Sequence, residues 1–237
     1  MSEPNKESLI ESIISYLWIA STITIAWIFF TILNRTVVYG RENVPLKKNL
    51  LLLPNHQTMI DSFVVGTKLF YPRTLLKPSL IPYHPAAQEN FFKNPVLAWM
   101  SKNWRAIPVK RGRKDIELMN KIIKMLPNCT MINFPEGTRS RTGKIGKGRS
   151  GVGKIIYDAK PTVIPVRIVG MNKVLPIGSY IPRIFKKIEV YYGKPIDFSD
   201  LYELPDNKET WLKIVDRVME HIKALAPDDS ENQEFSN

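Results

Sequence analysis

The chain contains 237 residues, which suffice for one domain of ordinary size or two small ones. Its hydrophobic fraction of 44% and charged fraction of 24% are typical of a globular protein with a buried core, and they exclude a chain that is disordered throughout. The formal net charge of +12 favours an anionic partner, such as membrane phosphate groups, nucleic acid, or a phosphorylated or acidic substrate.

The first predicted element is an apolar helix near the N-terminus. Residues 13–33 contain no charged side chain and would form a helix about 32 Å long, close to the thickness of a bilayer core. We therefore expect residues 1–34 to be a membrane-associated segment, either one spanning helix or a helical hairpin that enters one leaflet. A buried core helix is the alternative.

Basic residues are distributed unequally around this apolar segment. Lys6 alone precedes it, whereas four bases follow within fifteen residues: Arg35, Arg41, Lys47 and Lys48. The positive-inside bias then predicts that the segment anchors the chain to the cell membrane with the following domain on the cytoplasmic side.

Residues 35–226 alternate between strand-like and helix-like patterns. We expect strands at 49–53, 74–77, 106–109, 130–134, 162–169 and 188–192. We expect helices at 61–70, 94–102, 115–126, 151–158 and 208–225. This alternation predicts one α/β domain with a mixed, largely parallel sheet flanked by helices. Residues 227–237 carry four acids and no base, and are predicted to be an acidic, disordered tail.

The first motif with catalytic potential directly follows a predicted buried strand and runs from Asn55 to Asp61. Histidine ionises near neutral pH, so His56 can accept a proton from an alcohol, and a carboxylate can fix its tautomer. Five positions turn the chain by about 140° on a regular helix, so the two side chains meet only if His56 lies in the turn before the helix that contains Asp61. Capping or surface roles are the alternative.

The second motif, Phe134-Pro-Glu-Gly-Thr-Arg-Ser140, also follows an apolar strand. Arg139 and Arg141 carry fork-shaped donors that can bind a phosphate, and the bases Lys144, Lys147, Arg149 and Lys154 follow. A solvated basic loop is the alternative. The segment 148–154 has the glycine spacing of a nucleotide-binding loop, but Ile155 stands where Ser or Thr would bind magnesium, so we reject nucleotide binding.

Two further segments are ordinary strands by themselves, at 105–111 and 163–168. Each contains a proline, Pro108 and Pro165, which predicts an edge position or a bulge. Taken in order, the four segments resemble the glycerolipid acyltransferase family, whose best-known members acylate 1-acyl-sn-glycerol 3-phosphate. The resemblance covers about 50–170, and its most specific part is Asn-His-(four residues)-Asp followed by Phe-Pro-Glu-Gly-Thr-Arg-Ser.

The resemblance implies a role for each matching residue. His56 is the expected general base and Asp61 its orienting partner, while Glu136, Gly137, Thr138 and Arg139 form the acceptor-binding segment, with Arg139 on the phosphate. The other expected substrate-binding residues are Lys77, Arg111 and Pro165. No metal or cofactor is implied; the expected partners are a membrane lipid, a phosphorylated lipid acceptor, and acyl-CoA or acyl-carrier protein as co-substrate.

Two departures from the family pattern leave the acceptor open. Ser79 stands where a Glu is usual, and Arg105 where a Gly is usual. Glycerol 3-phosphate, another lysophospholipid or an aminoacyl lipid are therefore alternative acceptors, and a noncatalytic membrane-bound anion-binding protein is the alternative of another class. We expect no nucleic acid as partner because no recognition fold or aromatic-basic pattern is present. His84, His221 and Cys129 are interpreted as structural or surface groups.

Overall fold

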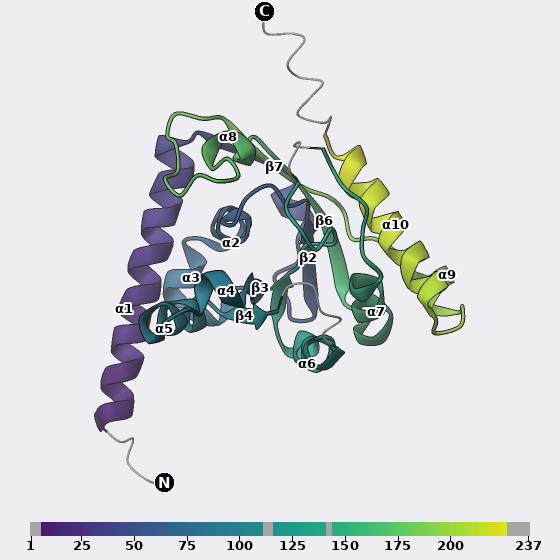
Figure 1. Cartoon of the computed structure of the whole chain (residues 1–237), viewed down its shortest axis with the longest axis horizontal. Coiled ribbons are helices and arrows are strands. Elements are labelled where there is room, and N and C mark those ends of the chain that lie inside the picture. The colour runs from purple at the N-terminus through teal and green to yellow at the C-terminus, as the bar shows by residue number, and fades with distance from the viewer. Residues whose placement is uncertain (1–5, 111–115, 141–143, 227–237) are drawn as a thin grey trace, which may run out of the picture.

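The computed structural model describes residues 6–110, 116–140 and 144–226, with the side chains of 6–8 left aside. Arg111, Arg141 and the predicted tail 227–237 lie outside the described residues. The main sheet has the strand order β1-β7-β6-β2-β5 (Figure 1). Its strands are β1 (Thr36–Tyr39), β2 (Leu50–Pro54), β5 (Thr130–Ile132), β6 (Thr162–Val169) and β7 (Ile188–Tyr192).

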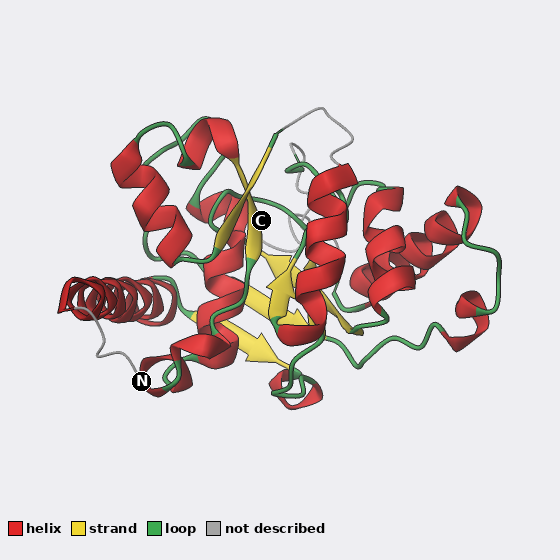
Figure 2. Cartoon of the chain, turned by 90° about the horizontal axis from the view of Figure 1, so that it is seen from below, coloured by secondary structure: helices red, strands yellow, loops and turns green. Residues whose placement is uncertain are grey.

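The strand pairs are parallel except for β6 with β7, which confirms the predicted mixed, largely parallel sheet. Helices lie on both sides of the strands (Figure 2). The longer helices are α2 (Asp61–Phe70), α5 (Pro95–Asn103), α6 (Ile116–Met125), α7 (Ser150–Ala159) and α10 (Lys208–Ala224). Single helical turns are α3 (Arg73–Leu76), α4 (Gln88–Phe91), α8 (Met171–Val174) and α9 (Ser199–Tyr202).

The β2 strand shows why the sheet is covered on both faces. All four of its leucines are fully buried, and successive side chains of a strand point to opposite faces. Leu50 and Leu52 belong to the core that includes residues of α2, whereas Leu51 and Leu53 belong to the core formed with α6, α7 and α10. A continuous apolar run is typical of such a strand, covered by helices on both faces.

A second, two-stranded parallel sheet extends the main one. It consists of β3 (His84–Ala87) and β4 (Ala106–Val109). The residue before β3, Tyr83, pairs with the β5 edge, since its N–H donates to Thr130 O at 2.9 Å and its carbonyl accepts from Ile132 N at 2.8 Å. This small sheet therefore continues the β5 side of the molecule.

Two details differ from the expectations. The predicted strand at 74–77 is wrong: it forms the helical turn α3, because Pro72 and Pro78 enclose a segment too short to pair, and Leu76 is exposed. Pro165 lies in β6, an internal strand of the sheet order, but the last β6–β7 pair is Val166 with Tyr192. Just beyond that pair the Gly193 N–H donates to Pro165 O at 2.9 Å, and Leu53 of β2 pairs with Pro165 on the other side. Pro165 is therefore not at an edge of the sheet, and the β6–β7 ladder ends where proline has no N–H to continue it.

The N-terminal segment is helical from Lys6 to Leu33, as α1 (Lys6–Ile28) continues into a π-helical turn, η1 (Phe29–Leu33). Leu9–Leu33 is long and apolar enough to cross a membrane. Only 11% of its apolar window is buried, so the alternative of a core helix is wrong. The uninterrupted helix also argues against a hairpin within these residues.

Candidate active site

The two sequence motifs meet at one edge of the sheet. β2 leads into His56 and β5 leads into Glu136, and these strands are parallel neighbours, so their carboxyl ends lie side by side. Ligands of α/β proteins bind at this edge. The topology thus brings His56 and Glu136, one from each motif, to the same edge of the sheet.

Asp61 organises the turn that carries His56. It is the first residue of α2, its side chain is 0% exposed, and its Oδ2 lies 2.9 Å from His56 Nδ1. The same oxygen accepts the backbone N–H of Gln57 at 2.6 Å and of Thr58 at 2.8 Å, while Oδ1 accepts the Thr58 hydroxyl at 2.6 Å. The expected arrangement, with histidine in the turn and aspartate at the helix start, is present.

The His56 imidazole is held but accessible. Its ring stacks on Phe134 with centroids 3.9 Å apart, and its side chain keeps 17% exposure. Since Nδ1 binds Asp61, Nε2 is the nitrogen left to accept a proton from a ligand. A buried carboxylate partner also stabilises the imidazolium that such a transfer would create.

Glu136 supports the same turn from the second motif. Its side chain is buried; Oε1 accepts the backbone N–H of His56 at 2.9 Å, and Oε2 accepts that of Gly146 at 2.8 Å. Burial raises the pKa of the Glu136 carboxyl, and these two N–H donors partly oppose the shift. Arg149 Nε binds the Glu136 carbonyl at 3.0 Å. Because backbone groups occupy both carboxylate oxygens, Glu136 is placed to position the His56 turn.

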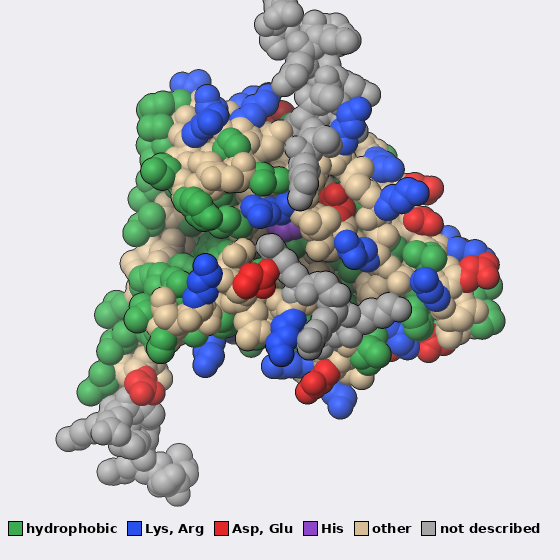
Figure 3. Space-filling model, in the orientation of Figure 1, with side chains coloured by type: hydrophobic (Ala, Val, Ile, Leu, Met, Phe, Trp, Pro, Cys, Tyr) green, Lys and Arg blue, Asp and Glu red, His purple; other side chains and the backbone are tan. Residues whose placement is uncertain are grey.

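A cavity opens beside the His56 ring. It is lined mainly by apolar side chains together with one base, among them His56, Phe63, Phe91, Trp104, Phe134 and Arg139. On the molecular surface a histidine is visible in a hollow next to Lys and Arg side chains (Figure 3). The cavity therefore brings a proton acceptor, an apolar wall and a guanidinium together.

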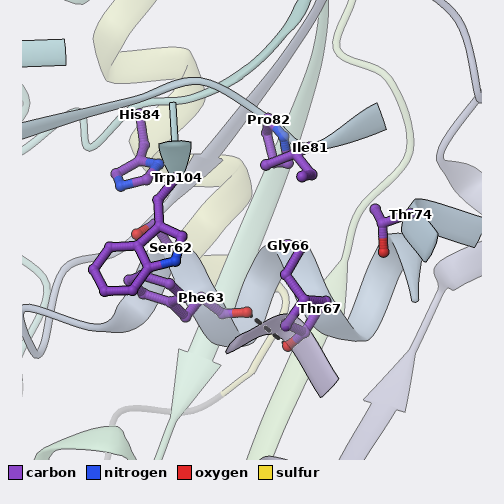
Figure 4. A pocket seen from close by; sticks show the side chains of 10 residues that line it. Ser62, Phe63, Gly66, Thr67, Thr74, Ile81, Pro82, His84 and Trp104 are labelled. Carbon is purple, nitrogen blue, oxygen red and sulfur yellow. Dashed lines mark hydrogen bonds between the residues drawn. The ribbon is translucent and has the colours of Figure 1, made fainter. Parts of the chain in front are cut away.

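A second, almost wholly apolar cavity lies next to this one, on the side of α1. The two share Ser62, Phe63, His84 and Trp104 in their walls, and the second reaches Ile23 of α1. Figure 4 shows Trp104 and Phe63 on one side of this space and Thr74 on the other, with Gly66 and Thr67 of α2 between them. The two cavities are thus neighbours that lie between His56 and the N-terminal helix.

On the other side of Arg139 lies a basic groove, lined by Thr138, Arg139, Lys144, Lys147 and Arg149 with few acids. Arg139 is thus the base that borders both the groove and the His56 cavity. The chemistry of this groove suits a phosphate. Gly137 has a φ of 66° and lies against the Arg149 side chain, where an added Cβ would meet Arg149 Cδ at 2.7 Å.

The remaining expected site residues lie farther from the imidazole. Lys77 is exposed at the end of α3 and lines neither cavity wall. Pro165 is buried opposite Leu53 in the neighbouring strand, where it can affect the site only through β2. Lys154 is engaged by Asp158 at 2.9 Å and Asp206 at 3.0 Å, consistent with the rejection of a nucleotide loop.

The two departures from the family pattern contact each other. Arg105 Nη1 donates to Ser79 O at 3.1 Å and to Ile81 O at 3.0 Å. Arg105 has a φ of 58°, a conformation that favours glycine and explains why Gly is usual there. Arg105 therefore has a strained backbone, and its side chain makes two hydrogen bonds that connect the 79–81 turn to the start of β4.

Sequence reasoning gave no role to several residues that hold the turn. Asn55 exchanges hydrogen bonds with the backbone of Ile168, at 3.0 and 2.7 Å. The Gln57 side chain accepts the Met171 N–H at 3.0 Å, which ties the His56 turn to α8. Their only sequence signal was a run of polar residues directly after a buried strand, where unpaired backbone groups need partners.

Comparison with known proteins identifies the family of the chain. The Acyltransferase family model matches residues 35–169, more than half of the chain, and the chain belongs to this family. The fold resembles the crystal structure of a 1-acyl-sn-glycerophosphate acyltransferase of Thermotoga maritima, with a TM-score of 0.62 and 24% identity over 96% of this chain and 86% of that one.

Two curated relatives carry names that state different activities. The 1-acyl-sn-glycerol-3-phosphate acyltransferase BAT2 of Brassica napus is 26% identical over 166 residues, covering 68% of this chain and 45% of its own length. An N-acylphosphatidylethanolamine synthase of Arabidopsis thaliana is 26% identical over 160 residues, covering 63% and 56%. The chain thus spans only about half the length of these relatives.

Proposed function

We propose that the chain transfers a fatty acyl group from an acyl thioester, acyl-CoA or acyl-carrier protein, to the hydroxyl of 1-acylglycerol 3-phosphate, making phosphatidic acid. The observation that carries this proposal is the His56–Asp61 pair beside a cavity that Arg139 borders. The relative from Brassica napus, named for this reaction, supports the acceptor.

In the proposed reaction His56 Nε2 takes the hydroxyl proton while the acceptor oxygen attacks the thioester carbonyl. The carbon–sulfur bond then breaks, and the proton passes to the thiolate that leaves. Asp61 keeps Nδ1 protonated and stabilises the charged ring, as in a serine–histidine–aspartate triad whose serine is replaced by the substrate alcohol.

The acceptor phosphate binds Arg139, with Lys77 and Arg111 as further bases that draw it in; Gly137 and Thr138 border its groove, and Glu136 acts through the turn it holds. The acyl chain occupies the apolar cavity that reaches α1. Binding the phosphate beside Arg139 and the acyl chain in the apolar cavity places the hydroxyl near His56 for attack. The reaction then takes place at the cell membrane, with the domain on the cytoplasmic side.

A second candidate is acylation of a phosphatidylethanolamine amine, favoured by the name of the relative from Arabidopsis thaliana. The test is an acceptor panel assayed with both thioester donors, following release of free thiol. The panel holds 1-acylglycerol 3-phosphate, glycerol 3-phosphate, other lysophospholipids, an aminoacyl lipid and phosphatidylethanolamine. We expect the first to react fastest; a faster reaction with any other member replaces our assignment, and no thiol release with any acceptor supports a noncatalytic anion-binding protein.

A further inference from the structure

The segment between α8 and β7 exposes several large apolar side chains close together in the chain. Tyr180, Ile181 and Phe185 are 87%, 80% and 76% exposed, and Ile177 and Ile184 add to the same surface. Contiguous exposed apolar side chains mark an interaction site. We call residues 176–187 the apolar loop.

The charges of the apolar loop narrow the choice of partner. Residues 171–187 contain four bases, Lys173, Arg183, Lys186 and Lys187, and no acid. Apolar side chains interspersed with Lys and Arg are typical of segments that lie at the surface of an anionic membrane. Lys187 also pairs with Glu189 of β7 at 3.0 Å, so Lys173, Arg183 and Lys186 are the bases of this segment that carry the attraction to phosphate groups.

The apolar loop is fastened to the end of the apolar N-terminal helix. Phe185 N–H donates to Leu33 O at 2.7 Å, and Lys186 N–H donates to the buried Asn34 Oδ1 at 3.0 Å. Phe185 has a φ of 60°, a strained conformation for an aromatic residue, which these bonds hold. Figure 1 shows the loop after α8 beside the upper end of α1.

The N-terminal helix itself lies along the domain. Tyr16 hydroxyl donates to Leu75 O, Trp104 Nε1 to Thr22 Oγ1, and Lys68 Nζ to Thr31 Oγ1, each at 3.0 Å. The opposite side of the helix exposes Leu17, Ile25, Ile28 and Ile32. A helix docked over these sixteen residues cannot cross a bilayer without drawing α2 and α5 into the hydrocarbon, where their polar groups would be costly.

We propose that the apolar loop is a second membrane-docking element, which inserts Tyr180, Ile181 and Phe185 into the same leaflet that the exposed side of α1 contacts. Its bases bind anionic headgroups. The partner is a lipid bilayer because the loop is hydrogen-bonded to the end of the N-terminal helix, and apolar side chains line the left edge of the molecule where that helix lies (Figure 3). The proposal rests on the membrane association of α1 and is independent of the acyl-transfer chemistry.

Docking of the loop affects the site through α8. The Gln57 side chain binds the start of α8, and the apolar loop begins two residues after α8 ends. When the loop is inserted in the leaflet, α8 and Gln57 thus hold the His56 turn at a fixed distance from the membrane surface. A lipid acceptor then has to raise only its headgroup to reach the imidazole.

The test is lipid quenching of a fluorophore on the full chain. In a Cys129→Ser background, a single cysteine is introduced at Tyr180, at Ile25 on the exposed side of α1, or at Lys208 on α10, which lies across the sheet from α1 (Figure 1). Each is labelled with a nitrobenzoxadiazole dye and reconstituted into phosphatidylcholine–phosphatidylglycerol vesicles that contain a doxyl-labelled lipid.

We expect quenching at positions 180 and 25 and none at 208. Quenching at 25 with position 180 as unquenched as 208 would overturn the loop's role while leaving α1 as the anchor. An unquenched label at 25 would overturn membrane association of α1 and this proposal with it. A blue shift at 180 caused by acyl-carrier protein or by higher protein concentration, without lipid, would assign the loop to a protein partner instead.

The role of the basic residues in headgroup binding is tested by changing the lipid composition. Quenching at position 180 should increase when phosphatidylglycerol is added to phosphatidylcholine vesicles, and should lose this dependence in the Arg183→Gln/Lys186→Gln variant. Equal quenching in both vesicle types would contradict headgroup binding by the bases.

Discussion

Glu136 Oε1 accepts the backbone N–H of His56 at 2.9 Å, although 80 positions separate the two residues in the chain. The hydrogen bond joins the two sequence motifs into one unit at the ends of neighbouring strands. The proton acceptor and the phosphate-binding groove therefore cannot move independently.

Glu136→Gln should reduce kcat with little effect on the Michaelis constant for the acceptor. One amide oxygen can accept only one of the two N–H groups that Glu136 now binds, so the other remains unsatisfied at a cost of about 1–3 kcal/mol, and the His56 turn shifts. We expect kcat to fall about 10- to 100-fold in steady-state assays.

Glu203→Gln, at an exposed position, is the matched control and should behave as wild type. If Glu136→Gln instead raised the acceptor's Michaelis constant at unchanged kcat, Glu136 would contact the acceptor directly, as the family resemblance implies.

Arg139→Ala should weaken binding of phosphorylated acceptors. Arg139 is the base that borders both the basic groove and the His56 cavity, and a charge-assisted hydrogen bond to phosphate contributes about 1.5–3 kcal/mol. We expect the Michaelis constant to rise about 10- to 100-fold, and Lys208→Ala to leave it unchanged. An unaltered Michaelis constant in the Arg139→Ala variant would contradict the role of Arg139 in phosphate binding.

Gly66→Leu should shorten the preferred acyl chain. A Cβ at Gly66 meets Pro82 Cγ at 3.4 Å, so it fits, and the rest of a leucine side chain has to fill the apolar cavity. We expect the ratio of octanoyl to palmitoyl transfer to rise by about tenfold or more, since each displaced methylene group contributes about 0.8 kcal/mol. The same ratio in variant and wild type would place the acyl chain elsewhere.

His84 should make the stability depend on pH below neutrality. Burial lowers its pKa to about 4, so the unfolded chain binds a proton between pH 6.5 and about 4 that the folded chain does not. The free energy of unfolding therefore falls as the pH falls through this window.

His84→Phe should flatten this dependence, which denaturant unfolding in detergent at pH 7 and pH 5 would measure. The comparison with wild type cancels the contribution of His56, which both chains share. A variant with the wild-type pH dependence would show that His84 does not titrate in this way.

The sequence predicted the fold where burial alone determines structure. The apolar runs at 50–53 and 162–169 form the central strands because only a sheet covered on both faces satisfies them. The prediction at 74–77 was wrong since a run of four residues carries too little periodicity, and the prolines on both sides exclude strand pairing. The small sheet of β3 and β4 was also not foreseen, because β3 gains its partners only through tertiary contacts.

The site was predictable only in part. The spacing of His56 and Asp61 indicated that they could meet, because a turn followed by a helix start is a local geometry. The bonds that hold the turn, from Glu136 to His56 and from Asn55 to Ile168, join segments more than 75 positions apart. No local pattern encodes such contacts, so Glu136 was interpreted as an acceptor ligand, whereas its carboxylate binds backbone groups.

The most direct test is thiol release by His56→Ala with an acyl thioester and 1-acylglycerol 3-phosphate, in protein shown by its unfolding transition to be folded. Loss of the general base and of its contact with Asp61 should reduce kcat by about 10³-fold or more. The His221→Ala variant, changed at an exposed histidine on α10, should keep wild-type turnover. Turnover at the wild-type rate in folded His56→Ala would contradict the account.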